Sequence, residues 1–219
     1  MSSTSSWMFV TNIKYNDAIV RRDPTRTVLT CHPETRSPAV EEIEARVNWT
    51  RDNALAFTYV LKGDLMRLRI PLPRPSRRTD RLWQHTCFEA FVALKSNPKY
   101  YEFNFAPSGQ WAAYSFQRYR VGTPLEDDIP TPKITSRKLA NGLDLEAIVH
   151  LGSLPVIQPG ACLQLALCAV IEDENGTLSY WALKHPPGKP DFHHPDGFTL
   201  DFEPSDVDTS NHPLYTDKR

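Results

Sequence analysis

The sequence predicts an all-β fold, an antiparallel sandwich with few short helices. Three observations lead to this prediction. Apolar side chains alternate with period two in segments of about five to ten residues, as in half-buried strands. The 19 prolines and 9 glycines fall mostly between these segments, where turns are expected. No sustained amphipathic helix and no internal repeat is visible, so roughly ten short strands in one sandwich are the natural architecture.

The N-terminal third supplies three or four of these strands. Thr27–Cys31 is a short candidate. Residues 37–49 fit two patterns: a capped helix, or a strand with Ile43, Val47 and Trp49 on one face. The strand-rich neighbours favour the strand. In 54–61, large apolar residues alternate with smaller ones, and Leu65–Ile70 continues in the same style after a Gly-Asp turn.

The middle of the chain predicts strands whose two faces are both covered. Thr86–Leu94 and Lys99–Phe105 are joined by a turn at Asn97-Pro98, and Gln110–Phe116 follows a second turn. Apolar or aromatic residues occupy both parities of the first two segments, so we expect other parts of the chain to lie on each face.

The C-terminal half completes the sandwich. Leu143–Leu151 alternates again, Leu163–Glu172 and Leu178–Lys184 form a hairpin around Asn175-Gly176, and Phe198–Phe202 is the last strand. We expect one domain over residues 1–219, with its core at about 25–203 and with 1–20 and 204–219 peripheral.

Composition excludes several classes of protein. With 25 basic and 26 acidic residues, the chain has no overall positive potential that would attract nucleic acid or an anionic membrane. No stretch approaches the ~18 apolar residues of a membrane span. Met1–Phe9 lacks a basic segment followed by an apolar run. The four cysteines form no C-x-x-C pair. We therefore expect a cytoplasmic protein with free thiols and neither a nucleic-acid nor a membrane partner.

Polar residues inside aromatic strands point to a ligand. His85, Glu89 and Asn104 stand in such segments, where a polar group must be paired or must meet a ligand. Glu89 and Glu102 could also form a glycosidase-like pair or support nearby loops. No nucleophile motif or second acid–base pair accompanies them, so no catalytic residue is predicted. This favours binding over catalysis without deciding whether the protein is an enzyme.

Three tryptophans are candidates for stacking on a flat ligand. Trp83, Trp111 and Trp181 fall at or near the ends of predicted strands, where the loops of a sandwich gather. The ordinary alternative is a place in the core.

The segment 185–196 is rich in histidine and aspartate. His185, Asp191, His193 and His194 could bind a divalent metal, which would suit a hydrolase-like enzyme. The prolines of the segment favour instead a rigid loop that forms one wall of a pocket, with His185 as a polar contact to the ligand.

Arginines crowd the segment before the middle strands. With one aspartate among them, they suit a solvated edge that resists strand pairing, and an anionic ligand remains an alternative. The arginines are Arg67, Arg69, Arg74, Arg77, Arg78 and Arg81.

Three groups of residues carry a family resemblance. They are Leu82-Trp83-Gln84-His85-Thr86-Cys87-Phe88-Glu89-Ala90-Phe91, then Tyr101-Glu102-Phe103-Asn104-Phe105 with Pro107-Ser108-Gly109 and Trp111, and Ser179-Tyr180-Trp181-Ala182-Leu183 running to Pro190-Asp191-Phe192-His193. In these segments the sequence resembles the bacterial, stand-alone DOMON-like proteins, which are related to family 9 carbohydrate-binding modules. The resemblance extends over most of the chain, from about Leu29 to Phe202.

The resemblance implies a jelly-roll type of β-sandwich with a pocket for a small ligand. Relatives bind sugars, which implies a sugar-like metabolite stacked on two of the three tryptophans. Other relatives bind haem through a methionine and a histidine or lysine, and here the methionines are Met1, Met8 and Met66. No cofactor is predicted, and haem, a divalent metal and a protein-interaction module remain alternatives.

Overall fold

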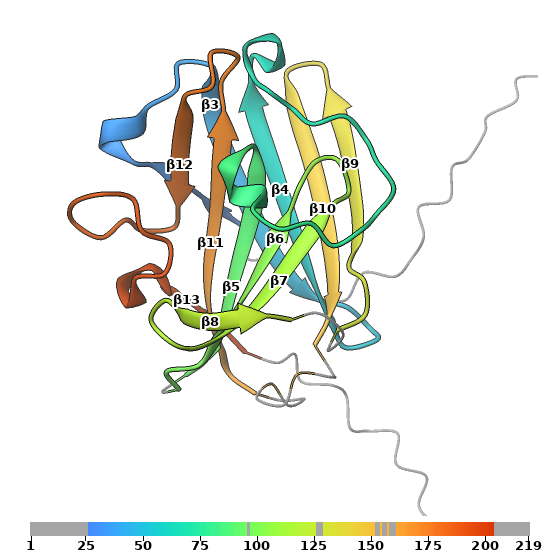
Figure 1. Ribbon diagram of the computed structural model, residues 1–219, viewed down its shortest axis with the longest axis vertical. Helices are drawn as coiled ribbons and strands as arrows, with labels where there is room; N and C mark the ends of the chain where they lie inside the picture. The colour runs from blue at the N-terminus through green and yellow to red at the C-terminus, as the bar shows by residue number, and fades with distance from the viewer. Residues whose placement is uncertain are drawn as a thin grey trace, which may run out of the picture.

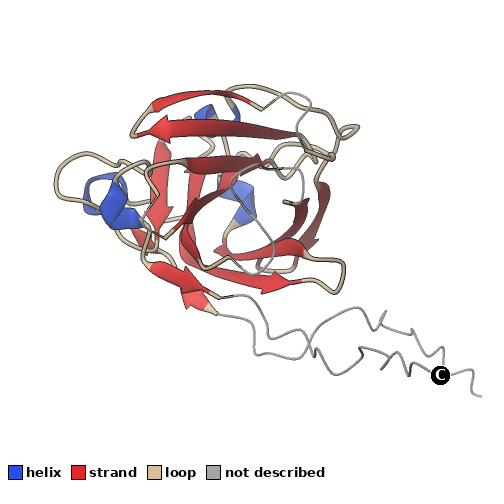
Figure 2. Ribbon diagram, turned by 90° about the horizontal axis from the view of Figure 1, so that it is seen from below, coloured by secondary structure: helices blue, strands red, loops and turns tan. Residues whose placement is uncertain are grey.

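The computed structural model describes residues 26–95, 97–125, 129–151, 154, 157 and 161–203. They form two antiparallel β-sheets packed face to face (Figures 1 and 2). The all-β sandwich predicted from the sequence is confirmed. The peripheral segments 1–20 and 204–219 lie outside the described residues. No helix in the described ranges is long and apolar enough to cross a membrane.

The smaller sheet has five strands in the order β1-β3-β4-β10-β9. Their bounds are Thr27–Val28 for β1, Val40–Trp49 for β3, Ala54–Gly63 for β4, Gly142–His150 for β10 and Lys133–Leu139 for β9.

The larger sheet has eight strands. Seven follow the order β2-β12-β11-β5-β6-β7-β8, and β13 pairs with the beginning of β11. Their bounds are Thr30–Cys31 for β2, Leu178–Ala182 for β12, Leu163–Glu172 for β11, Cys87–Leu94 for β5, Tyr100–Phe105 for β6, Trp111–Arg118 for β7, Val121–Pro124 for β8 and Leu200–Phe202 for β13.

Short 3-10 helices supply the remaining regular structure of the described residues. They are η1 (Pro33–Thr35), η2 (Leu65–Arg67), η3 (Leu82–Gln84) and η4 (Pro195–Gly197). The prediction of a strand at 65–70 is therefore wrong. The Asp64 side chain accepts a hydrogen bond from the Met66 amide, which caps a 3-10 turn there. The strand interpretation of 37–49 is confirmed as β3, whereas β8 and β9 were not predicted.

The main core lies between the sheets. Phe57, Tyr59 and Leu61 point inward from β4, and Phe88 and Phe103 point inward from the larger sheet, all fully buried. The Tyr59 hydroxyl donates a hydrogen bond to the Glu89 carbonyl oxygen at 2.8 Å, which ties the two sheets together across the core.

The outer face of the larger sheet is also covered, as the sequence predicts for its middle strands. Every residue of β6 is buried. Phe91 and Tyr100 pack on this face against Phe192 and Phe198 of the segment that follows β12. Leu82 of η3 packs with Cys87 and Ala112 in a second small cluster. A region of the face remains open between the two clusters.

All four cysteines are free thiols. Cys87 and Cys168 are buried under the outer face, whereas Cys162 is exposed. Cys168 lies directly opposite Glu89 in the pairing of β11 with β5.

Candidate functional site

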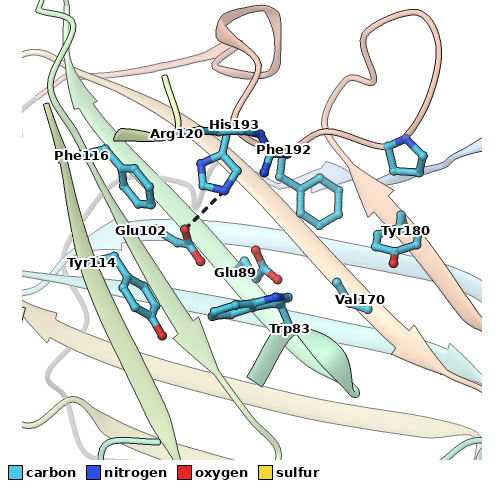
Figure 3. Close-up of a pocket in the computed structure, with 11 residues that line it drawn as sticks. Trp83, Glu89, Glu102, Tyr114, Phe116, Arg120, Val170, Tyr180, Phe192 and His193 are labelled. Atoms are coloured by element: carbon cyan, nitrogen blue, oxygen red, sulfur yellow. Dashed lines mark ion pairs between the residues drawn. The ribbon is translucent and has the colours of Figure 1, made fainter. Parts of the chain in front are cut away.

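A pocket of about 300 Å³ opens on the outer face of the larger sheet, between the two apolar clusters. Glu89 from β5, Glu102 from β6 and Val170 from β11 form its floor. Figure 3 shows both carboxyl groups pointing into the space between the surrounding rings.

The period-two geometry of the strands brings the two acids onto one face. Residues 88 and 90 of β5 face the core, so Glu89 between them faces outward. Glu89 pairs directly with Asn104, while Phe91 pairs with Glu102. Glu89 and Glu102 are therefore diagonal neighbours on the outer face, within reach of each other's charge.

The hydrogen bonding of the floor is incomplete. Asn104 donates from Nδ2 to Glu102 Oε1 at 2.6 Å, and the other Glu102 oxygen lies 3.7 Å from Nε2 of His193 (Figure 3). The Glu89 side chain is buried, and its Oε1 has no hydrogen-bond partner. An unpaired buried acceptor costs about 1–3 kcal/mol, more if it is charged. A polar group placed beside Glu89 Oε1 would therefore complete the hydrogen bonding of the floor.

Burial raises the pKa of both acids. The pKa of Glu89 is raised well above its usual value by burial and then by the neighbouring Glu102. The pKa of Glu102 is raised to about 7, chiefly by burial, against the lowering effects of the Asn104 hydrogen bond and of Arg120. The pair thus retains protons at pH values where an exposed glutamate has lost its own.

The rim of the pocket carries one cation and one neutral histidine. Arg120 donates to Asp191 at 2.7 Å and to the Tyr119 hydroxyl at 3.3 Å. The pKa of His193 is lowered to about 4 by burial and by Arg120, and its Nδ1 is hydrogen-bonded to the Tyr100 hydroxyl at 2.9 Å. His193 is therefore uncharged at neutral pH.

Five aromatic rings wall the pocket. Tyr114 and Phe116 come from β7, Tyr180 from β12, Trp83 from η3, and Phe192 from the segment after β12. Trp83 packs edge-on against Tyr114 at 5.8 Å and remains 39% exposed, so part of its indole is open to solvent.

The turn that holds Trp83 begins in a strained conformation. Arg81, the residue before η3, has a φ of 61°, in the left-handed region that non-glycine residues seldom occupy. The loop therefore holds an unfavourable backbone angle at the point where it turns the indole toward the pocket.

The seven residues predicted to contact a ligand do not lie together in the structure. Trp83 and Glu89 line the pocket, and Asn104 lies beneath it, bonded to Glu102. Trp111 and Trp181 are only 4% and 6% exposed and pack in the core between the sheets. Their positions in β7 and β12 point to the inner face, so they offer no open ring to a ligand.

The two predicted histidine contacts lie elsewhere. Nδ1 of His85 is 2.8 Å from Glu172 Oε2, beside a second hollow of about 830 Å³ that includes Arg69 and Arg74. Nε2 of His185 is 2.8 Å from the Thr30 carbonyl oxygen, and its ring packs edge-on against His32. Neither residue lines the pocket between Trp83 and His193.

The residues considered for metal binding do not converge. His193 faces Glu102 and Tyr100, Asp191 pairs with Arg120, and Nδ1 of His194 accepts from the Asp196 amide. Within the described ranges, no three histidine, cysteine, aspartate or glutamate side chains group as metal ligands do. The loop prediction for 185–196 fits better, because Pro190, Phe192 and His193 form one wall of the pocket.

The methionine considered as a haem ligand does not lie at the pocket. Met66 is 87% exposed in η2 and does not line the pocket. Met1 and Met8 lie outside the described residues.

Several lining residues were not predicted as ligand contacts. They are Glu102, Tyr114, Phe116, Arg120, Val170, Tyr180, Pro190, Phe192 and His193, the last of which was considered only as a metal ligand. Tyr114 pairs with Glu102 across β6 and β7, so its ring and that carboxyl share one face. The alternation of side chains along β7 could therefore have predicted that Tyr114 and Phe116 lie on the same face as Glu102. Arg120 and Phe192 reach the pocket from a turn and a loop, whose courses have no such period.

No protein-family model matches the sequence, and no curated protein matches it. Among solved structures, the chain is similar to a protein from Bacteroides uniformis provisionally assigned as carbohydrate-binding, with a TM-score of 0.60 and 14% identity over 82% of this chain and 87% of that one. A family 9 carbohydrate-binding module from Caldicellulosiruptor kristjanssonii is also similar. Its complex with cellotriose gives a TM-score of 0.46 at 14% identity over 75% of each chain. Its complex with glucose gives 0.42 at 14% identity over 70% of this chain and 71% of that one. The first of these comparisons supports the two-sheet fold.

Proposed function

We propose that the protein binds a small carbohydrate in the pocket floored by Glu89 and Glu102. The observation that carries the proposal is the buried Glu89 carboxyl, whose Oε1 lacks a partner at the bottom of an aromatic pocket. Sugars offer hydroxyl groups that donate and accept hydrogen bonds at their edges, and C–H faces that pack on aromatic rings.

The size and chemistry of the pocket agree with such a ligand. A volume of about 300 Å³ lies at the lower end of the range for small-molecule pockets, which suits one or two sugar rings. The partly exposed indole of Trp83 supplies a stacking surface, and Glu102 and Arg120 supply polar contacts. The provisional assignment of the Bacteroides uniformis protein, which has a similar fold, supports the same function.

The test is a thermal-shift screen of the purified protein against mono- and disaccharides, followed by calorimetric titration. A ligand at about 100 times its dissociation constant adds about 2.7 kcal/mol of stability, a clear rise in melting temperature. The sugar should be recovered chemically unchanged. If no sugar produces a saturable shift, the proposal is wrong and a protein-interaction role becomes the better hypothesis.

Two variants locate the site. Glu89→Gln should weaken sugar binding at least tenfold, because the amide presents a different set of donors and acceptors to the same ligand atoms. Glu172→Gln is the matched control: Glu172 is also a buried glutamate, on β11, but it pairs with Arg69 and His85 outside the pocket. Equal losses in both variants would place the ligand elsewhere.

A further inference from the structure

The ionisable groups that line the pocket are unequal in kind. Its floor holds two carboxyl groups, and its rim holds one guanidinium, that of Arg120. Asp191 already pairs with this guanidinium at 2.7 Å. Among the described residues, no lining side chain gives Glu89 a positive partner.

The aromatic walls add to this imbalance. Trp83, Tyr114, Phe116, Tyr180 and Phe192 surround the two carboxyl groups (Figure 3). The face of an aromatic ring carries partial negative charge and attracts cations within about 6 Å of its centre. Acids below and rings around them both favour a positive group in the space between.

The remaining groups near Glu89 do not alter this balance. Apart from Arg120, the titratable groups around it are acids, thiols, phenols and the neutral imidazole of His193. By element, they are Cys87 on β5, Glu102 on β6, Tyr114 on β7, Cys168 on β11, Tyr180 on β12, Tyr59 from the opposite sheet, and His193 on the segment after β12. An incoming cation would therefore find its counter-charge in Glu89 and Glu102 once these carboxyl groups ionise.

We propose that the ligand is an amino sugar whose protonated amine lies between Glu89 and Glu102, within the ring of aromatic side chains. This inference rests on the proposed carbohydrate-binding function and names the class of sugar. A charge-assisted hydrogen bond to each carboxylate would satisfy the unpartnered Glu89 oxygen more strongly than a neutral hydroxyl does.

Proton counting separates the two kinds of ligand. An ammonium group stabilises the ionised carboxyl, so each acid that was protonated releases its proton to the buffer when the amine binds. A neutral sugar that accepts a hydrogen bond from a protonated carboxyl leaves the proton in place. Calorimetry in buffers of different ionisation enthalpy measures this number directly.

The experiment compares matched sugar pairs by titration calorimetry at pH 6. The probes are glucosamine, galactosamine and mannosamine, each beside its neutral parent hexose and its N-acetyl derivative, with ethanolamine as a non-sugar amine. We expect one amino sugar to bind at least tenfold more tightly than its parent, with proton release. In Glu89→Gln this preference should fall to within about twofold, whereas Glu172→Gln should keep it.

The outcomes separate the inference from the proposed function. A parent hexose that binds as tightly as its amino derivative, without proton release, overturns the inference and leaves sugar binding intact. Binding of ethanolamine with no binding of any sugar overturns both the carbohydrate function and the amino-sugar assignment. No binding of any probe overturns the amino-sugar inference, and the wider screen of mono- and disaccharides then decides the carbohydrate function.

Discussion

Replacing Glu102 with glutamine should make the stability of the folded protein less sensitive to rising pH. The pKa of Glu102 is raised from 4.5 to about 7 by burial. Between these values the folded state binds more protons than the unfolded state, so the free energy of unfolding falls as the pH rises through this window. One pKa unit corresponds to about 1.36 kcal/mol, which gives a loss of about 3 kcal/mol by pH 8. Glutamine does not ionise and keeps an oxygen for the Asn104 hydrogen bond.

His193 contributes with the opposite sign. Its pKa is lowered from 6.5 to about 4, so the unfolded state binds more protons between these values. Stability therefore falls as the pH drops through that window. This opposing contribution reduces the pH dependence of the wild-type protein's unfolding free energy below pH 6.5. Because His193 is present in both proteins, the difference between their curves removes its contribution.

The assay is urea unfolding of both proteins at pH 5, 6, 7 and 8. We expect the difference in unfolding free energy, variant minus wild-type protein, to grow by about 2–3 kcal/mol between pH 5 and pH 8. The double variant Glu89→Gln/Glu102→Gln should lose still more of the downward slope, because the pKa of Glu89 is also raised by burial. Parallel curves, with a difference constant to within about 0.5 kcal/mol, would refute the idea that the fold buries a titrating carboxyl here.

Three further substitutions test the placement of particular residues. Trp83→Ala should lower the free energy of unfolding less than truncation of a fully buried tryptophan does, because the indole is 39% exposed, yet should weaken sugar binding at least tenfold in a titration. Trp181→Ala should instead lower the free energy of unfolding in urea by about 3–5 kcal/mol, because this indole is buried in the core. Gly142→Ala should cost about 1–3 kcal/mol in the same assay, because the added methyl group would collide with the carbonyl oxygen of Leu61 on β4. Unchanged urea midpoints for Trp181→Ala or Gly142→Ala would show that these positions are less tightly packed than the structure has them.

Most strands could be predicted because burial on one face forces a two-residue period. The alternation in 54–61 and 143–151 places their large side chains in the core as β4 and β10. β9 has a weak signal, since none of its residues is buried and its sequence, Lys-Ile-Thr-Ser-Arg-Lys-Leu, is largely polar. An edge strand buries little, so hydrophobic patterning leaves it almost unmarked.

The residues at the floor of the site could be predicted from the sequence more reliably than those of its walls. Glu89 and Asn104 are polar residues in covered strands, and their strands set them side by side. The tryptophans show why residue type alone is a poor guide. Trp111 lies opposite Phe105 in the pairing of β6 with β7, so parity directs it toward the core. Trp83 is held by a 3-10 turn, which follows no strand parity.

Two buried cysteines beneath the pocket would report when the cover of the outer face opens, without the introduction of a cysteine for labelling. Cys87 and Cys168 flank Glu89 within the sheet, and burial raises the pKa of each thiol. Alkylating reagents should react first with the exposed Cys162 and next with the partly buried Cys31. They should react with Cys87 and Cys168 only when the segments that cover the outer face move away, because burial blocks access and keeps these thiols protonated. The rate of the slow phase of alkylation thus reports how often this face opens, and the sugar that we propose to bind at Glu89 should lower that rate.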